Sequence, residues 1–177
     1  MLFVPKNLTS LSSIDPSIAT LPLSNIPQDK HYIDLTRAGT IVVLSQPPGQ
    51  YCAVLGGIMA TRMKVLGASG VVASGRCRDL RELRETGLPI WARGTSTVGT
   101  GAEAQPWALD VPIVVGGVTV RPGDVILADP LEGVVVIPVE KVAKVLEILP
   151  GIVGADEKVL EMVKEGGGVK EAFAKFR

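Results

Sequence analysis

Short apolar runs separated by glycine- and proline-containing turns mark most of this chain. Residues 40–45 form a β-branched run that ends in a polar loop, and residues 70–74 form a second apolar run. Runs of this length and composition predict buried strands. Between them, Met59, Met63 and Leu66 stand at the spacing of one helix face. The pattern therefore predicts a strand, a helix and a second strand.

This strand–helix–strand unit also predicts where a ligand binds. A right-handed crossover makes the two strands parallel. The loops that carry Gly56-Gly57 and Arg78-Asp79 each follow the carboxyl end of a strand, so both open at the same edge of the sheet. Ligands of open α/β sheets bind at that edge.

The remaining pattern predicts further strands and helices. Strands are expected at residues 1–5, 89–92, 111–115, 118–120, 125–129 and 133–137, and helices at 79–85, 142–149, 159–163 and 169–176. Gly116-Gly117 predicts a hairpin turn. Pro150-Gly151 is expected to break the C-terminal helical region.

The elements together predict an α/β fold: a single-domain layered structure with a mixed central β-sheet flanked by helices. The 177 residues, 46% of them hydrophobic, suit one compact domain, residues 1–177. Residues 6–30 are rich in Ser, Pro, Thr and Asn and are expected to form a mobile surface loop. Residues 139–177 are expected to supply the C-terminal helices.

Composition excludes several classes of partner. A net charge of zero and a pI near 6.6 give no basic surface for a nucleic acid. No apolar run approaches the roughly 20 residues that cross a bilayer, so no membrane contact is expected. Cys52 and Cys77 lack metal-ligand or redox spacing and are expected to be reduced thiols. A cytoplasmic protein is expected.

The glycine pair and the Arg-Asp pair each have two interpretations. In the structural one, Gly56-Gly57 marks a turn, Arg78 is a surface residue, and Asp79 forms a capping box with Glu82. In the chemical one, amides at the Gly57 helix start face an anion and Arg78 grips a carboxylate. Asp79 then offers the hard oxygen ligand that Mg²⁺ or Mn²⁺ prefers. Spacing alone leaves both interpretations open.

Other titratable residues are predicted to be structural or solvated. Asp124, Asp129 and Glu132 lie in predicted turns. His31, the only histidine, lacks a phosphate-cradling glycine pattern and is expected to be a structural or surface residue. Lys64 lies on the solvated face of the predicted helix, so no Schiff-base lysine is predicted.

Four ordered blocks of the sequence resemble the RraA-like family, which includes the 4-hydroxy-4-methyl-2-oxoglutarate aldolases and the regulator of ribonuclease activity A. The blocks are Gly56 to Ala60, Gly70 to Asp79, Leu88 to Gly94, and Val120 to Asp129 running into Gly133 to Pro138. The resemblance implies an RraA-like fold of the swivelling β/β/α type. Related chains usually carry a helical segment before the first strand, so either a shortened chain or cover from another protomer is expected here.

The resemblance also implies the site. Gly56, Gly57, Ile58 and Met59 correspond to the substrate-binding loop, Arg78 to the catalytic and substrate-binding arginine, and Asp79 to the metal ligand. Many aldolase members carry acidic residues where this sequence has Gly57 and Ser74.

The implied function is a divalent-metal-dependent lyase that cleaves a small 2-oxo acid to pyruvate. It would act as a class II-type 4-hydroxy-4-methyl-2-oxoglutarate aldolase, an oxaloacetate decarboxylase or both, with Mg²⁺ (or Mn²⁺) as cofactor, in a homotrimer or hexamer. The alternative is a non-catalytic protein that regulates a ribonuclease or helicase. The Arg78-Asp79 pair favours the enzyme.

Overall fold

The computed structural model describes residues 1–8 and 24–177. Most of the predicted mobile loop at residues 6–30 falls on residues 9–23 and so lies outside the described residues. The chain divides into two compact units, each with its own packing. Unit 1 comprises residues 1–122 and 128–134, and unit 2 comprises residues 123–127 and 135–177. That the whole chain forms a single domain stays a prediction.

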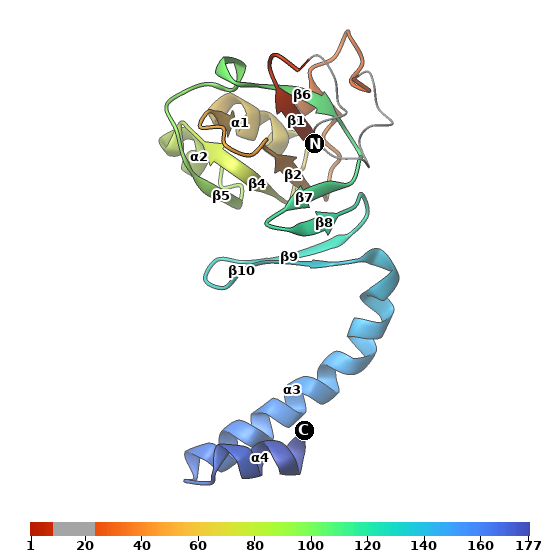
Figure 1. Ribbon diagram of the computed structural model, residues 1–177, viewed down its shortest axis with the longest axis vertical. Coiled ribbons are helices and arrows are strands. Elements are labelled where there is room, and N and C mark those ends of the chain that lie inside the picture. Colours follow the sequence, from red (N-terminus) through yellow and green to blue (C-terminus); the bar gives the residue numbers. More distant parts are fainter. Residues whose placement is uncertain (9–23) are drawn as a thin grey trace. The chain divides into compact units, whose positions relative to one another are not determined.

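Unit 1 contains a six-stranded mixed sheet (Figure 1). Its strands are β1 (Leu2–Pro5), β2 (Ile41–Ser45), β3 (Ala53–Leu55), β4 (Gly70–Cys77), β5 (Ile90–Thr95) and β6 (Ala104–Ala108). The pairs β1–β2, β2–β4, β3–β4 and β4–β5 are parallel, and β1–β6 is antiparallel. The predicted α/β class with a mixed, helix-flanked sheet is confirmed.

Strand β4 organises the sheet because three strands pair with it. Strand β5 pairs with β4 from Val71 to Cys77 and so occupies one edge. The other edge is shared, since β2 pairs with residues 70–74 and β3 takes over at Arg76 and Cys77. The predicted parallel crossover is confirmed, although the strand directly before the helix is β3. Its three residues are too few to give a period in the sequence.

The side chain of Gln46 fills the junction between β2 and β3. Its Nε2 donates to the Cys52 carbonyl oxygen at 2.7 Å, and its Oε1 accepts from the Arg76 amide at 3.0 Å. Gln46 is buried, so these bonds satisfy polar atoms that water does not reach. A Cβ atom added at Gly75 would lie 2.3 Å from Gln46 Oε1, which is why this strand position holds a glycine.

Helices α1 (Gly57–Val65) and α2 (Leu80–Glu85) pack against each other, and η2 (Tyr32–Leu35) contacts α1. Met63 and Leu83 join a buried cluster with Leu44, Leu55 and other strand residues. This cluster is the core that fixes the carboxyl ends of the strands beneath the two helices.

The N-terminal strand lies in the same core. Leu2, Phe3 and Val4 are buried, and the Phe3 ring meets the Tyr32 ring edge-on at 5.6 Å between centroids. The side chains of the first strand are therefore buried within unit 1.

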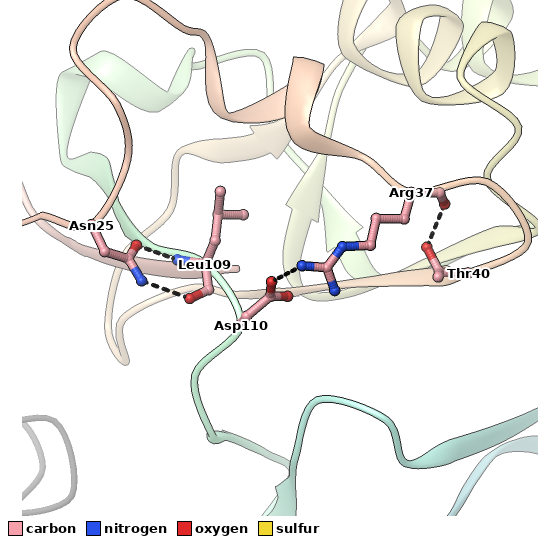
Figure 2. A network of polar contacts seen from close by, with 5 residues as sticks. All are labelled: Asn25, Arg37, Thr40, Leu109 and Asp110. Carbon is pink, nitrogen blue, oxygen red and sulfur yellow. Dashed lines mark hydrogen bonds and ion pairs between the residues drawn. The ribbon is translucent and has the colours of Figure 1, made fainter.

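Polar contacts fix the segment before β2 to the chain after β6 (Figure 2). The Asn25 side chain donates to the Leu109 carbonyl oxygen and accepts from the Leu109 amide, both at 2.8 Å, as a neighbouring strand would. Arg37 forms an ion pair with Asp110, and the Thr40 hydroxyl donates to the Arg37 carbonyl oxygen. This network holds the entry to β2.

Two further two-stranded sheets follow β6. Strands β7 (Ile113–Val115) and β8 (Val118–Val120) pair antiparallel. Gly116 and Gly117 at their turn have φ of 58° and 84°, the left-handed conformation that this hairpin requires. Strands β9 (Val125–Asp129) and β10 (Gly133–Ile137) form the other sheet. All four strands confirm their predictions.

Unit 2 contains η4 (Val139–Lys141), α3 (Val142–Lys164) and α4 (Val169–Phe176). The predicted break at Pro150-Gly151 is wrong, because α3 continues through Pro150. A proline removes one N–H donor and crowds one carbonyl, and the hydrogen bonds on either side carry the helix past it. Val159 of α3 and Ala172 of α4 are buried.

None of the helices in the described residues is long and apolar enough to span a membrane.

We expect Gly75→Ala to lower the free energy of unfolding by about 1–3 kcal/mol, because the new methyl group would displace the buried Gln46 amide. Urea denaturation measures the loss. Gly101→Ala is the matched control, since a Cβ atom there meets nothing within 4 Å. Equal stability of the two variants would contradict the proposed role of Gln46.

Candidate functional site

A cavity of about 540 Å³ opens at the carboxyl edge of the unit 1 sheet. Its volume is in the range of small-molecule sites. Five of the six residues predicted from the sequence line it: Gly56, Ile58, Met59, Arg78 and Asp79. The sixth, Gly57, is hydrogen-bonded to one of them. The two loops therefore meet at one cavity, and the roles of these residues stay predictions.

The glycine pair allows the two loops to approach closely. A Cβ atom added at Gly56 would lie 2.7 Å from Asp79 Oδ2 and 3.1 Å from Arg78 Nε. A Cβ atom added at Gly57 would lie 2.6 Å from the Glu82 Cβ atom. Any side chain at Gly57 would thus require Glu82 at the start of α2 to shift.

Asp79 does not cap the helix that follows it, so the capping-box interpretation is wrong. Its backbone is left-handed, with φ of 59° and ψ of 46°, and its side chain makes no capping bond to α2. A capping residue normally has an extended backbone. The Oδ2 atom of Asp79 instead accepts from the Gly57 amide at 3.0 Å.

This contact changes how the start of α1 meets a ligand. The Gly57 amide, predicted to face a bound anion, is occupied by the Asp79 carboxylate. The first intrahelical bond runs from the Ala60 amide to the Gly56 carbonyl oxygen. The amides of Ile58 and Met59 therefore have no acceptor within the helix and can serve a ligand carboxylate.

Arg78 combines a fixed backbone with an accessible side chain. Its amide donates to the Leu55 carbonyl oxygen at 2.9 Å, which ties the end of β4 to the end of β3. Its Nε lies 3.7 Å from Asp79 Oδ2, and its side chain is 46% exposed. The long contact to Asp79 leaves guanidinium donors for a substrate carboxylate.

The loop after β5 forms another wall of the cavity through Gly99, Thr100 and Gly101. The Thr100 hydroxyl donates to the Ala53 carbonyl oxygen at 2.5 Å, and the Ala53 amide donates to the Val98 carbonyl oxygen at 2.8 Å. The loop is thus bonded along β3 and continues into η3 (Thr100–Ala102).

Glu103 anchors the other end of this loop, and sequence reasoning missed it. Its Oε2 accepts from the amides of Tyr51 and Cys52 at 2.6 and 2.7 Å. These bonds favour the ionised form and hold the pKa of Glu103 below its ordinary value of 4.5. No local spacing signals this role, because 51 residues separate Glu103 from Cys52.

The donor set at the cavity offers a divalent cation one protein carboxylate. Within residues 1–8 and 24–177, no group of three or more His, Cys, Asp or Glu residues is placed to hold a metal. Asp79 is the one carboxylate among the described residues that line the cavity. Mg²⁺ commonly keeps several waters and takes one or two carboxylates together with substrate oxygens. Asp79 can serve as the single carboxylate of such a site. The described residues of this chain do not form a site in which protein groups alone surround the cation.

Two of the three acids predicted to be solvated turn residues, Asp124 and Asp129, accept hydrogen bonds from backbone amides. Asp129 Oδ1 accepts from the amides of Leu131 and Glu132 at 2.7 and 2.8 Å, which lowers the pKa of Asp129. Asp124 Oδ1 accepts from the Val139 amide at 3.2 Å.

The cysteines and the histidine also follow their predictions in part. Cys52 and Cys77 are free and buried, and burial raises the pKa of both thiols, which disfavours the reactive thiolate. His31, expected to be a structural or surface residue, is exposed and lines the cavity. No sequence pattern indicated its place at the cavity.

The fold and the cavity define an α/β protein with a small-ligand site at the carboxyl edge of a mixed sheet. The sequence matches the family model described as RraA-like: Aldolase/RraA over residues 18–136. The chain therefore belongs to the RraA-like family.

Relatives with two kinds of name match this chain. A protein of Halalkalibacterium halodurans, named "Putative 4-hydroxy-4-methyl-2-oxoglutarate aldolase", is 35% identical over 109 residues, covering 62% of this chain and 51% of that protein. A protein of the same name from Deinococcus radiodurans is 35% identical over 111 residues, covering 62% of this chain and 69% of that protein. The chain spans about half the length of the first of these relatives.

A solved structure carries the other kind of name. Streptomyces coelicolor RraAS2, described as an unusual member of the RNase ES inhibitor RraA protein family, matches with a TM-score of 0.65 and 29% identity. The match covers 93% of this chain and 72% of that one. The RraA-like matches thus include proteins named as putative aldolases and a protein described as a member of the RNase ES inhibitor RraA family.

We expect the contribution of Glu103 to stability to depend on pH. Because its pKa is lower in the folded state, the contribution is fully present above the unfolded value and is lost as the pH falls through the folded value. Glu103→Gln should therefore melt at a lower temperature than wild type near neutral pH, and the difference should vanish in acid. Thermal melts across this range measure it, with the exposed Glu85→Gln as control. A difference that persists in acid would contradict the assignment.

Proposed function

We propose that this protein is a divalent-metal-dependent lyase that cleaves a small 2-oxo acid to pyruvate, as a 4-hydroxy-4-methyl-2-oxoglutarate aldolase, an oxaloacetate decarboxylase or both. The observation that carries the proposal is the meeting of Arg78, Asp79 and the start of α1 at one cavity. The names of the aldolase relatives support the same chemistry.

The substrate carboxylate and 2-keto oxygen bind between Arg78 and the amides of Ile58 and Met59. The guanidinium fork matches a carboxylate, and the positive end of the α1 dipole favours the same charge. These groups orient the substrate before its carbon–carbon bond breaks.

Bond cleavage leaves its electron pair on the pyruvate fragment as an enolate. In the retro-aldol reaction the substrate's C4 hydroxyl gives its proton to a water molecule as the other product becomes a carbonyl compound. In decarboxylation the other product is carbon dioxide. The enolate carbon then takes a proton from water and gives pyruvate. Arg78 stabilises the negative charge that develops on the enolate oxygen.

Asp79 would hold Mg²⁺ or Mn²⁺, with waters completing the shell. When bound, the cation supplies Lewis-acid stabilisation of the same developing charge. Because Asp79 is the one described carboxylate lining the cavity, the proposal includes a homotrimer or hexamer in which a neighbouring subunit supplies further acidic ligands.

We expect Asp79→Asn and Arg78→Gln each to lower kcat/KM for pyruvate release by about 100-fold or more. Arg78→Gln removes the positive charge that stabilises the enolate, and Asp79→Asn removes the carboxylate that would hold the cation. A lactate-dehydrogenase-coupled assay with 4-hydroxy-4-methyl-2-oxoglutarate and with oxaloacetate measures the loss. Glu85→Gln and Arg81→Gln are matched controls, because that exposed ion pair lies on α2 outside the cavity lining. Unchanged activity in the site variants would refute the assignment.

Removal of divalent cations should abolish turnover, and added Mg²⁺ or Mn²⁺ should restore it. The coupled assay is run with EDTA and then with excess metal, and the rate of the free metal on oxaloacetate is subtracted. Full activity in EDTA would refute the metal role while leaving the Arg78 role open to its own test.

The second candidate is the non-catalytic alternative, a protein that binds a ribonuclease or helicase. The structural similarity to RraAS2 at 29% identity favours it. It predicts no turnover of either substrate by wild-type protein, with or without metal.

A further inference from the structure

A second set of polar residues lines the same cavity and has no part in the roles above. Lys6, His31 and Gln105 come from the end of β1, the start of η2 and β6. None of them belongs to the crossover that carries Gly56 and Arg78. The cavity therefore has polar groups from two separate parts of the sheet.

Lys6 follows β1 and Arg78 follows β4, two strands of one sheet. Leu2 of β1 pairs with Ser45 of β2, and Ser45 pairs with Ser74 of β4. Lys6 lies four residues after Leu2, and Arg78 lies four residues after Ser74. Because β1, β2 and β4 are parallel, Lys6 and Arg78 both lie just after the carboxyl ends of their strands. Strand β2 lies between β1 and β4, so those two strands are two strand spacings, about 10 Å, apart.

The backbone at Lys6 is fixed, and its side chain is open. Its amide donates to the Glu103 carbonyl oxygen at 2.8 Å, and its carbonyl oxygen accepts from Gln105 Nε2 at 3.3 Å. Lys6 is exposed, and it forms no ion pair with any carboxylate in the described part of the chain. A cation placed in this way can bind an anion from solution.

His31 offers a ring N–H donor to the same cavity. Its Nδ1 accepts from the Ile33 amide at 3.3 Å, so Nε2 is the ring nitrogen that carries the proton for a ligand. Its ring stacks on Tyr32 with centroids 4.5 Å apart, which fixes its orientation. The Nε2–H group is thus available to a ligand.

We infer that Lys6 and His31 bind the distal carboxylate of a dicarboxylic 2-oxo acid whose 1-carboxylate and keto group bind at Arg78. This inference rests on the proposed site at Arg78 and assigns residues to the second carboxylate, which both proposed substrates carry. Two separated cations in a cavity of 540 Å³ match a substrate with two carboxylates. A monocarboxylic acid would leave Lys6 without a partner.

The test is a comparison of two ligands that differ in the distal carboxylate. Isothermal titration calorimetry of the full chain with Mg²⁺ present measures binding of 2-oxoglutarate and of 2-oxobutyrate. Wild type should prefer 2-oxoglutarate. Lys6→Gln should weaken 2-oxoglutarate about tenfold and leave 2-oxobutyrate unchanged, because only the distal charge loses its partner. His31→Ala should show a smaller loss of the same kind, and His31→Gln should recover part of it.

The exposed Lys64→Gln on α1 is the matched control, because it removes the same charge outside the cavity lining. Equal loss for both ligands in Lys6→Gln, the same loss in Lys64→Gln, or no preference in wild type would each overturn the inference. Failure of the proposed function is distinguishable, since a protein without turnover that still prefers 2-oxoglutarate through Lys6 retains the inferred subsite.

Discussion

The hydrogen bond between the Asp79 carboxylate and the Gly57 amide is the contact on which the site depends. It joins the end of β4 to the start of α1, and it forms only because neither Gly56 nor Gly57 carries a Cβ atom. A negative oxygen at a helix N-terminus is electrostatically favourable, which helps to offset the left-handed backbone of Asp79. The arrangement brings a guanidinium, a carboxylate and two free amides to one cavity.

The rest of unit 1 places these two loops at the same edge of the sheet. Strand β3 pairs with the last residues of β4, and the Arg78 amide bonds to the Leu55 carbonyl oxygen where both strands end. The loop from Val98 to Glu103 is hydrogen-bonded to Cys52 and Ala53 at the start of β3. Backbone hydrogen bonds thus define the cavity walls, and side chains supply its charge.

Much of this could be predicted from the sequence, because β-branched runs and turn residues signal their structure locally. The strand at residues 41–45, the hairpin at Gly116-Gly117 and the meeting of the two loops all follow from such patterns. Strands β3 and β6 were missed because one is three residues long and the other, Ala104–Ala108, contains Pro106 and little β-branched sequence. The role of Asp79 was ambiguous, because the local sequence is the same whether its side chain caps the next helix or accepts from a distant amide. Glu103, Lys6 and His31 depend on pairing between distant segments, which spacing does not encode.

The Gln46 junction implies a rule for how this sheet can vary. Gln46 and Gly75 share one space, so a larger residue at position 75 demands a smaller one at position 46. Residues 47–49 lie before residues 50–52, which bond to Glu103, and β2 and β3 are each registered on β4 rather than on one another. Insertions between the two half-length strands should be accommodated there, while the paired positions 46 and 75 should covary.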